Sequence, residues 1–275
     1  MPSENIFLGN GSDEIIDLCF RTFCRPGYEK ALTFVPTYGM YEVSASVNDV
    51  AMIKIPLDEN FQIDTGKVVP YLKDPTIKLI FICTPNNPTG NSFDSKSLEF
   101  IIERFNGIVV IDEAYNDFSQ KESMRFRLSS YPNLIVMQTF SKSLGLAAAR
   151  IGMAFTSGAI IQYFNRIKPP YNISTINQTA AIEKLSIPDR TRLQVKRIIS
   201  ERERLKKDLN KLSIIEKVFP SDSNFLLVRV RKPDSVYREL AGRGIIVRNR
   251  SRIIPGCLRI TVGNRLENRK LIKTL

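Results

Sequence analysis

Short apolar runs alternate with helix-type patterns from the start of the chain to about residue 156. Three of the runs, at residues 78–83, 107–112 and 134–137, are apolar almost throughout, which is typical of strands buried on both faces. Amphipathic stretches such as residues 95–105 separate them. This alternation predicts an α/β fold, with a mostly parallel sheet covered by helices on both faces.

The pattern changes after residue 172. Two long helical stretches, residues 174–185 and 189–212, come first. Three short strand-like runs follow, at residues 225–230, 245–247 and 258–262. We therefore expect a large domain of residues 1–185 and a smaller α+β domain of residues 186–275.

Polar side chains follow each of the three apolar runs. Asn87 lies in the turn after the first run, and Asp112 and Tyr115 lie at the end of the second. Lys142 comes shortly after the third. Because open α/β sheets bind ligands at the carboxyl ends of their strands, we expect these side chains to share one site.

Lys142 is the centre of the predicted chemistry. A lysine at the end of a strand can form a Schiff base with a carbonyl group. Thr139, Ser141 and Arg150 would suit a phosphate group, and Asp112 could keep a pyridinium nitrogen protonated. A Ser-Lys pair alone is also common at the start of an ordinary helix. The lysine, the phosphate-binding groups and the carboxylate together predict pyridoxal phosphate as the cofactor.

The first turn of the chain offers a second anion-binding element. Residues 5–8 are predicted to form a strand, and residues 9–14 to turn into a helix that runs to residue 23 and that Ser12 or Asp13 can cap. The free N–H groups at the start of this helix would bind the cofactor phosphate. Without the other motifs, a capped helix and nothing more would explain the pattern.

The amino-acid composition narrows the possible functions. The 275 residues are 43% hydrophobic and 25% charged, as in ordinary globular proteins. The absence of histidine excludes Ser-His and Cys-His nucleophiles, and four cysteines without metal-type spacing suit a reduced cytoplasm and no metal site. The chain has no apolar run of about 18 residues and no signal-type start, so we expect neither a membrane span nor secretion.

The net charge of +12 raises nucleic acid as a partner. Much of this charge lies in residues 190–211, where apolar side chains are interleaved with the basic ones. That arrangement predicts an amphipathic helix with a solvated basic face. No aromatic platform or zinc-finger pattern accompanies it, so we expect no nucleic-acid partner and only a modest attraction of anionic substrates.

Several segments, in the same order along the chain, resemble one enzyme family. Asn-Asn-Pro-Thr-Gly at 86–90, Asp-Glu-Ala-Tyr at 112–115 and Ser141-Lys142 with the trailing Arg150 resemble the fold-type I aminotransferases of class I and II, which use pyridoxal phosphate. The finer resemblance is to histidinol-phosphate aminotransferases, at residues 36–41, 244–248 and 258–263. It covers the chain from about Asn5 to the C-terminus.

The resemblance implies roles for individual residues around the cofactor. It implies a sheet of the seven-stranded type, with the cofactor carried by Lys142 and its ring nitrogen facing Asp112. Asn87 and Tyr115 would then face the phenolate oxygen of the ring. Tyr38 would stack on the ring, whereas Tyr41 is expected to be structural.

The remaining implied residues bind the cofactor phosphate or the substrate. The turn that contains Ser12 and Asp13 would contact the phosphate mostly through its backbone. Arg248 and Arg259, together with Asn87, would bind the anionic groups of the substrates, because a planar guanidinium can bind carboxylate or phosphate through two hydrogen bonds. A surface ion pair is the alternative for each arginine.

The implied reaction transfers an amino group from L-histidinol phosphate to 2-oxoglutarate in a cytoplasmic homodimer of the histidine pathway. Aromatic or other amino-acid aminotransferases and amino-acid-phosphate decarboxylases share the motifs and stay open as alternatives. Members of the family carry several dozen residues before the point that matches Met1, including an arm that reaches the neighbouring subunit's site. A truncated chain, a misplaced start and a non-catalytic binding or assembly remnant therefore also stay open.

Overall fold

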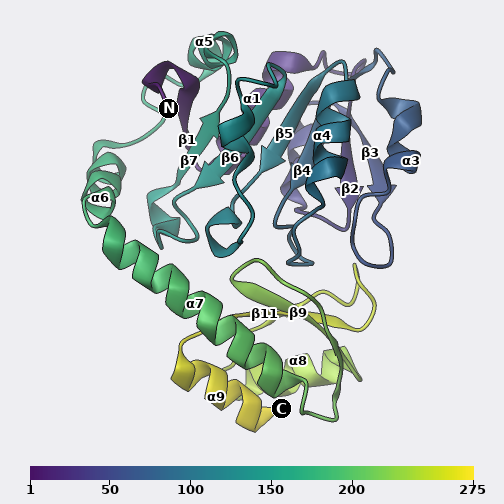
Figure 1. Cartoon of the computed structure of the whole chain (residues 1–275), viewed down its shortest axis with the longest axis vertical. Coiled ribbons are helices and arrows are strands. Elements are labelled where there is room, and N and C mark those ends of the chain that lie inside the picture. Colours follow the sequence, from purple (N-terminus) through teal and green to yellow (C-terminus); the bar gives the residue numbers. More distant parts are fainter.

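The computed structural model describes residues 1–275, and its larger part is built on a seven-stranded sheet of order β1-β7-β6-β5-β4-β2-β3 (Figure 1). The strands are β1 (Ile6–Asn10), β2 (Lys30–Val35), β3 (Ala51–Pro56), β4 (Ile77–Cys83), β5 (Ile108–Asp112), β6 (Leu134–Thr139) and β7 (Ile151–Phe155). β2 pairs in parallel with β3 and β4, and the β4–β5 and β5–β6 pairs are parallel too. β7 alone runs antiparallel to its neighbours, β1 and β6. The predicted mostly parallel sheet of an α/β fold is confirmed.

Helices cover both faces of this sheet because alternate residues of each strand point to opposite sides. Phe81 of β4 packs in one core with Phe20 of α1, and Ile82 packs in a second core with Ile101 of α4. The first core includes residues of α1 (Ser12–Phe23), α2 (Met40–Val47) and α5 (Gly158–Ile167). The second includes residues of α3 (Thr65–Val68) and α4 (Ser95–Arg104). The apolar runs of the sequence are therefore the shared middle layer of a three-layer sandwich.

A four-stranded antiparallel sheet forms the second part of the molecule, in the order β10-β11-β9-β8. Its strands are β8 (Ile215–Val218), β9 (Phe225–Val230), β10 (Arg248–Asn249) and β11 (Cys257–Thr261). The prediction of a strand at residues 245–247 is wrong. Ile245 still donates its backbone N–H to Leu240 at the end of a helix, and pairing with β11 begins at Arg248, opposite Arg259.

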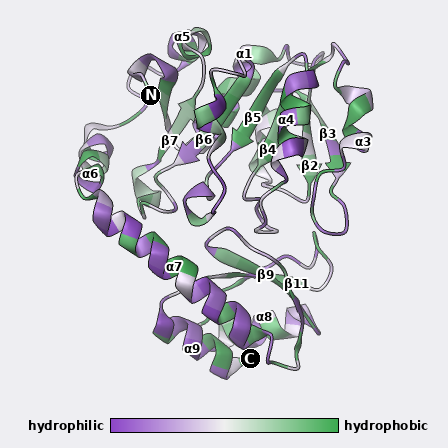
Figure 2. Cartoon of the chain, viewed as in Figure 1, coloured by the Kyte–Doolittle hydropathy of each residue, from purple (hydrophilic) through white to green (hydrophobic).

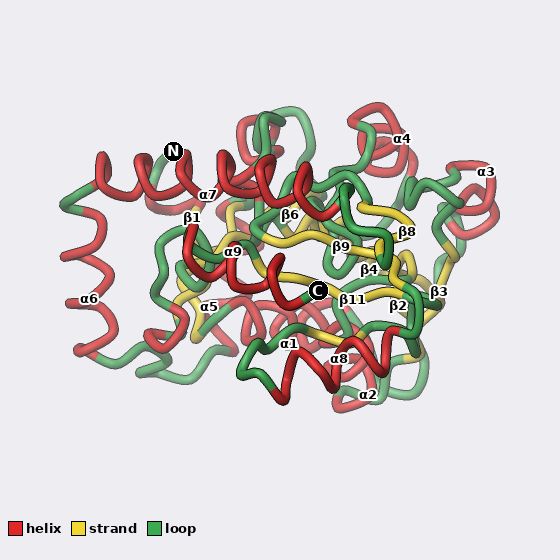
Figure 3. Tube along the Cα trace, turned by 90° about the horizontal axis from the view of Figure 1, so that it is seen from below, coloured by secondary structure: helices red, strands yellow, loops and turns green.

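Three helices pack on the face of the small sheet that points away from the large one (Figures 1 and 3). They are α7 (Pro188–Leu209), α8 (Pro233–Gly242) and α9 (Arg265–Thr274). Leu205, Leu240 and Leu271, one from each helix, share a core with Val228 of β9. The opposite face of the small sheet is thereby left to face the carboxyl edge of the large sheet.

The helix α7 links the two sheets along one side of the molecule (Figure 1). It follows α6 (Thr175–Leu185), and most of its length is hydrophilic (Figure 2), as the amphipathic pattern predicts. Arg202 is buried and donates to the backbone oxygens of Phe118 and Ser223, and so joins α7 to both parts. The domain boundary after residue 185 stays a prediction. None of the helices combines the length and the apolar character needed to cross a membrane.

Candidate active site

A cavity of about 530 Å³ lies between the carboxyl edge of the large sheet and the facing side of the small sheet. All twelve residues singled out from the sequence line it: Ser12, Asp13, Tyr38, Asn87, Asp112, Tyr115, Thr139, Ser141, Lys142, Arg150, Arg248 and Arg259. Three loops that follow β4, β5 and β6 supply the central ones. The topology explains this gathering, because neighbouring parallel strands end at the same edge.

Lys142 lies in the turn after β6 and is half-buried. Its Nζ lies 5.5 Å from the centre of the Tyr115 ring. Burial lowers the pKa of Lys142, and the positive charge of Arg259 lowers it further, with a smaller contribution from Arg150. A lysine with a lowered pKa can accept a proton nearer to neutral pH.

Asp112 ends β5, and its side chain is buried. Its Oδ2 accepts a 2.7 Å hydrogen bond from the hydroxyl of Tyr41, and its Oδ1 accepts one of 3.0 Å from the backbone N–H of Ala114. Burial raises the pKa of Asp112, and these two bonds oppose the rise. A buried carboxylate that stays ionised can hold a proton on a facing ring nitrogen.

Tyr41 is fully buried, as expected for a structural residue, and its ring stacks on Phe81 at 5.0 Å. Its bond to Asp112 also gives it a part in the site that was not predicted from the sequence. The signal was its place three residues after Tyr38, which brings two tyrosines to one end of α2. Their rings meet edge to face at 5.6 Å.

The residues predicted to bind the cofactor phosphate also lie together in the cavity. Thr139 donates from its hydroxyl to Ser141 at 3.1 Å, and Arg150 has a left-handed backbone with φ 48°. The guanidinium of Arg150 lies 3.1 Å from Oδ2 of Asp13, whose Oδ1 accepts a 3.0 Å bond from the hydroxyl of Tyr38. The Asp13 carboxylate is thus held by two partners, and its backbone N–H remains the group that suits an anion.

The start of α1 differs from the expected capping. The residue before the helix is Gly11, no side chain caps it, and Ser12 and Asp13 form the first turn. The prediction that Ser12 or Asp13 caps the helix is therefore wrong. Position 152 requires glycine, because the Cβ of any other residue there would lie 2.5 Å from the backbone N of Ser12. The close approach of β7 brings this helix start to the cavity.

The small sheet forms the side of the cavity that faces the large sheet. Arg259 of β11 donates a 2.7 Å bond to Oδ1 of Asn87, which leaves the amide nitrogen of Asn87 free to donate. The guanidinium of Arg259 also lies 4.9 Å from the ring centre of Phe225. The ring of Tyr115 packs edge to face on the ring of Phe225, with 5.2 Å between the ring centres. These contacts join the two halves of the molecule across the cavity.

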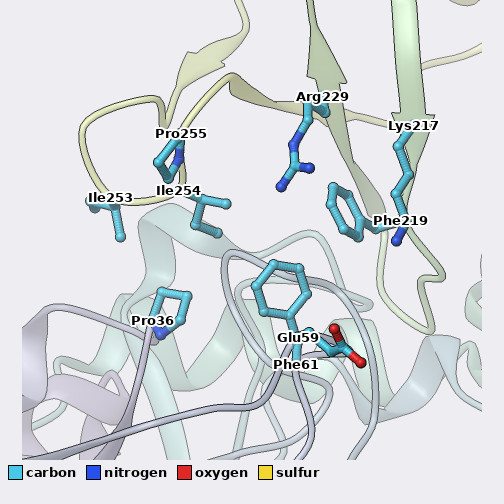
Figure 4. Close-up of a pocket in the computed structure, with 9 residues that line it drawn as sticks. All are labelled: Pro36, Glu59, Phe61, Lys217, Phe219, Arg229, Ile253, Ile254 and Pro255. Atoms are coloured by element: carbon cyan, nitrogen blue, oxygen red, sulfur yellow. The ribbon is translucent and has the colours of Figure 1, made fainter.

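Arg250 also lines the cavity, although it was not among the residues predicted from the sequence. The signal was its spacing of two from Arg248, which places both side chains on one face of an extended segment. A neighbouring cavity of about 460 Å³, shown in Figure 4, lies beside the same loop. It contains none of the twelve residues, and its lining includes Phe61 of the large part and Phe219 of the small part, whose rings are 5.1 Å apart.

Comparisons with known proteins place this arrangement in a family. The profile of aminotransferase class I and II matches residues 1–275. A histidinol-phosphate aminotransferase of Parabacteroides distasonis is 50% identical over 274 residues, which are 99% of this chain and 79% of that protein. The histidinol-phosphate aminotransferase of Bacteroides thetaiotaomicron is 48% identical over 274 residues, again 99% of this chain and 79% of that protein.

Solved structures agree with the sequence relatives. The histidinol-phosphate aminotransferase of Clostridium acetobutylicum superposes with a TM-score of 0.90 at 28% identity, covering 98% of this chain and 82% of that one. The Sinorhizobium meliloti enzyme, solved in complex with pyridoxal-5'-phosphate, shares the fold with a TM-score of 0.88 at 23% identity, over 98% of this chain and 75% of that one. The chain therefore belongs to the class I and II aminotransferases and, within them, to the histidinol-phosphate aminotransferase family.

Proposed function

We propose that this aminotransferase transfers the amino group of L-histidinol phosphate to 2-oxoglutarate, with pyridoxal phosphate as cofactor, in histidine biosynthesis. The observation that carries the proposal is one cavity that joins Lys142 and Asp112 to arginines without carboxylate partners. The names of the sequence relatives support the same substrate. The free thiols of all four buried cysteines support a reducing compartment such as the cytoplasm.

The residues present fit the cofactor. Lys142 offers an amine for its aldehyde, and buried Asp112 offers a carboxylate for its ring nitrogen. The start of α1 and the hydroxyls of Thr139 and Ser141 would hold its phosphate, with Arg150. When bound, pyridoxal phosphate supplies a carbonyl carbon for the amino group and a ring that accepts electrons.

The protein's own groups would then orient the substrate and move its proton. Arg259 would bind the anionic group of the substrate and so aim the amino-bearing carbon at Lys142. The Nζ of Lys142, whose pKa is lowered, would take the proton that this carbon loses. Asp112 would hold the proton of the ring nitrogen through the reaction, and the hydrogen bond from Tyr41 would keep its carboxylate ionised.

We further propose that the protein works as a homodimer. Apolar side chains are exposed along α6 and the loop before it, where Ile176 is 80% and Tyr171 95% exposed. Exposed apolar surface of this kind is typical of an interface. Light scattering on the purified protein tests the proposal, and a monomer at micromolar concentration would contradict it.

A panel of amino donors tests the substrate. The measurement is kcat/KM with saturating 2-oxoglutarate, for L-histidinol phosphate, aromatic amino acids and a phosphorylated amino acid. We expect histidinol phosphate to exceed every other donor at least tenfold, which corresponds to about 1.4 kcal/mol in the transition state. Faster turnover of aromatic amino acids, release of carbon dioxide from the phosphorylated amino acid, or bound cofactor without turnover would each contradict the proposal.

A further inference from the structure

The turn that carries Lys142 is held mainly by hydrogen bonds within itself. The backbone N–H of Gly145, for example, donates to the carbonyl of Lys142 at 3.1 Å. The hydroxyl of Ser143 is the exception, because it donates to Oδ2 of Asp117, 26 residues earlier in the chain. This is the only hydrogen bond from residues 140–146 to a part of the chain outside residues 139–151. The side chain next to Lys142 is therefore the one that ties its turn to the rest of the molecule.

The accepting carboxylate lies on a segment that is itself firmly held. Asp117 is in the short helix η3 (Asn116–Phe118), two residues after Tyr115. Phe118 is fully buried and packs in one core with Tyr115. Its backbone oxygen accepts a 3.2 Å hydrogen bond from buried Arg202. Asp117 thus offers Ser143 an acceptor whose backbone is fixed by the residue that follows it.

The bond connects two segments whose side chains meet in the active-site cavity. The Nζ of Lys142 lies 5.5 Å from the centre of the Tyr115 ring, and both residues line the cavity. A displacement of a reacting group by about 1 Å can lower a rate up to about 100-fold. Ser143 is only 2% exposed, and neither Ser143 nor Asp117 lines the cavity. Any effect of this pair on the chemistry would therefore act through the position of Lys142.

We propose that Asp117 and Ser143 are positioning residues, and that the hydrogen bond between them holds Lys142 where its amine reaches the aldehyde of pyridoxal phosphate. A hydrogen bond to a carboxylate is stronger than one between neutral groups, so it suits this task. Burial and the charges of other residues are the main influences on the pKa of Lys142, which leaves Asp117 a role in geometry. This inference rests on the proposed function, because it takes Lys142 as the residue that carries the cofactor.

The test compares Asp117→Ala, Ser143→Ala and the double variant with the parent protein. Asp74→Ala is the matched control, because Asp74 accepts a 2.7 Å bond from the hydroxyl of Thr76 in the turn before β4, at the opposite edge of the sheet. It loses the same kind of bond and the same charge far from the cavity. All variants are prepared without cofactor and mixed with pyridoxal phosphate.

The first measurement is the rate at which Lys142 forms an adduct that borohydride can trap. We expect each alanine variant of the pair to react roughly 10-fold more slowly than the parent, and Asp74→Ala to react like the parent. The double variant should react no more than about twofold more slowly than either single variant, because the two residues act through one bond. Asp117→Asn keeps an acceptor oxygen and should react within about threefold of the parent rate.

Two further measurements separate a displaced lysine from a generally loosened site. Inorganic phosphate, measured by isothermal titration calorimetry, should bind within about threefold of the parent affinity in every variant, because the pair lies outside the groups predicted to bind phosphate. Hydrogen exchange of residues 140–146, followed by mass spectrometry, should be at least about threefold faster in Asp117→Ala and Ser143→Ala than in Asp74→Ala.

The inference would be overturned by parent-like adduct rates in both alanine variants, by additive losses in the double variant, or by unchanged exchange of the turn. Loss of phosphate binding in step with the adduct rate would also overturn it, because the pair would then support the whole site. If Lys142 of the parent forms no adduct, the proposed function fails, and hydrogen exchange still decides whether this bond holds the turn.

Discussion

The hydroxyl of Tyr41 donates a 2.7 Å hydrogen bond to Oδ2 of Asp112, and both side chains are buried. Burial raises the pKa of Asp112, and the bond from Tyr41 is the largest effect that opposes it. Tyr41 thus helps to keep the carboxylate ionised in surroundings that favour its neutral form. Because only the ionised form can hold a proton on a ring nitrogen through charge, we expect this bond to affect turnover.

Tyr41→Phe should lower kcat about tenfold, or about 1.4 kcal/mol, with little loss of cofactor affinity. Without the hydroxyl, the pKa of Asp112 rises further. The carboxylate then ionises only at higher pH, so the acidic limb of the kcat profile should move to higher pH. The measurement is kcat from pH 5 to 9 for the parent and the variant. An unmoved acidic limb would show that Tyr41 has a packing role alone.

Asp112→Asn should reduce turnover much more than it weakens cofactor binding. The amide keeps the shape of the side chain and removes the charge, and the loss of a charged hydrogen bond of roughly 1.5–3 kcal/mol predicts a 10- to 150-fold lower kcat. We expect cofactor affinity to depend mainly on the residues predicted to bind the phosphate, so it should change less than about threefold. Turnover at the parent rate would make Asp112 a structural residue.

Gly11→Ala should weaken cofactor binding by displacing Arg150. Gly11 has φ 77°, and a Cβ there would lie 2.6 Å from Nη2 of Arg150. Gly244→Ala is a matched control, because Gly244 has φ 72° and open space around the same position. Both variants should lose about 1–3 kcal/mol of unfolding free energy from backbone strain. Only Gly11→Ala should also bind the cofactor more weakly, and equal cofactor affinity in both variants would contradict the role of this turn.

The lowered pKa of Lys142 predicts that the cofactor-free parent protein and the variant Lys142→Met differ in unfolding free energy by an amount that depends on pH. An unfolded lysine titrates near ~10.4, so at neutral pH folding places a charged ammonium where it is disfavoured. This penalty is fully present below the folded pKa and disappears as pH rises through the folded pKa towards ~10.4. Lys142→Met lacks the penalty and should be more stable than the parent at pH 7, by a margin that shrinks towards pH 10. Denaturant unfolding at several pH values measures it, and a constant margin would contradict it.

The sequence was enough to predict the large sheet and the grouping of the site residues. Continuous apolar runs mark buried parallel strands, and strand topology then brings Asn87, Asp112 and Lys142 to one edge. The small sheet was predicted less well, because a strand as short as Arg248–Asn249 carries little periodic signal and its register depends on pairing with β11. Arg250 was missed because its place in the cavity follows from this pairing.

Side-chain partners were the least predictable part of the site. Tyr41 carries the pattern of an ordinary core residue, and its bond to Asp112 depends on how α2 packs over β4 and β5. Asp13 was expected near the cofactor phosphate, whereas its carboxylate is held by Arg150 and Tyr38. The partners in both contacts are far apart in the chain, so local spacing does not reveal which side chains will meet.

Chemical trapping of the cofactor tests the central claim, that Lys142 holds pyridoxal phosphate at the carboxyl edge of the sheet. The cofactor-loaded protein is reduced with borohydride, digested and analysed by mass spectrometry, beside Lys142→Ala treated in the same way. We expect a stable pyridoxyl adduct on Lys142 in the parent protein and none in the variant. An unmodified Lys142, or an adduct on another lysine that persists in Lys142→Ala, would contradict it.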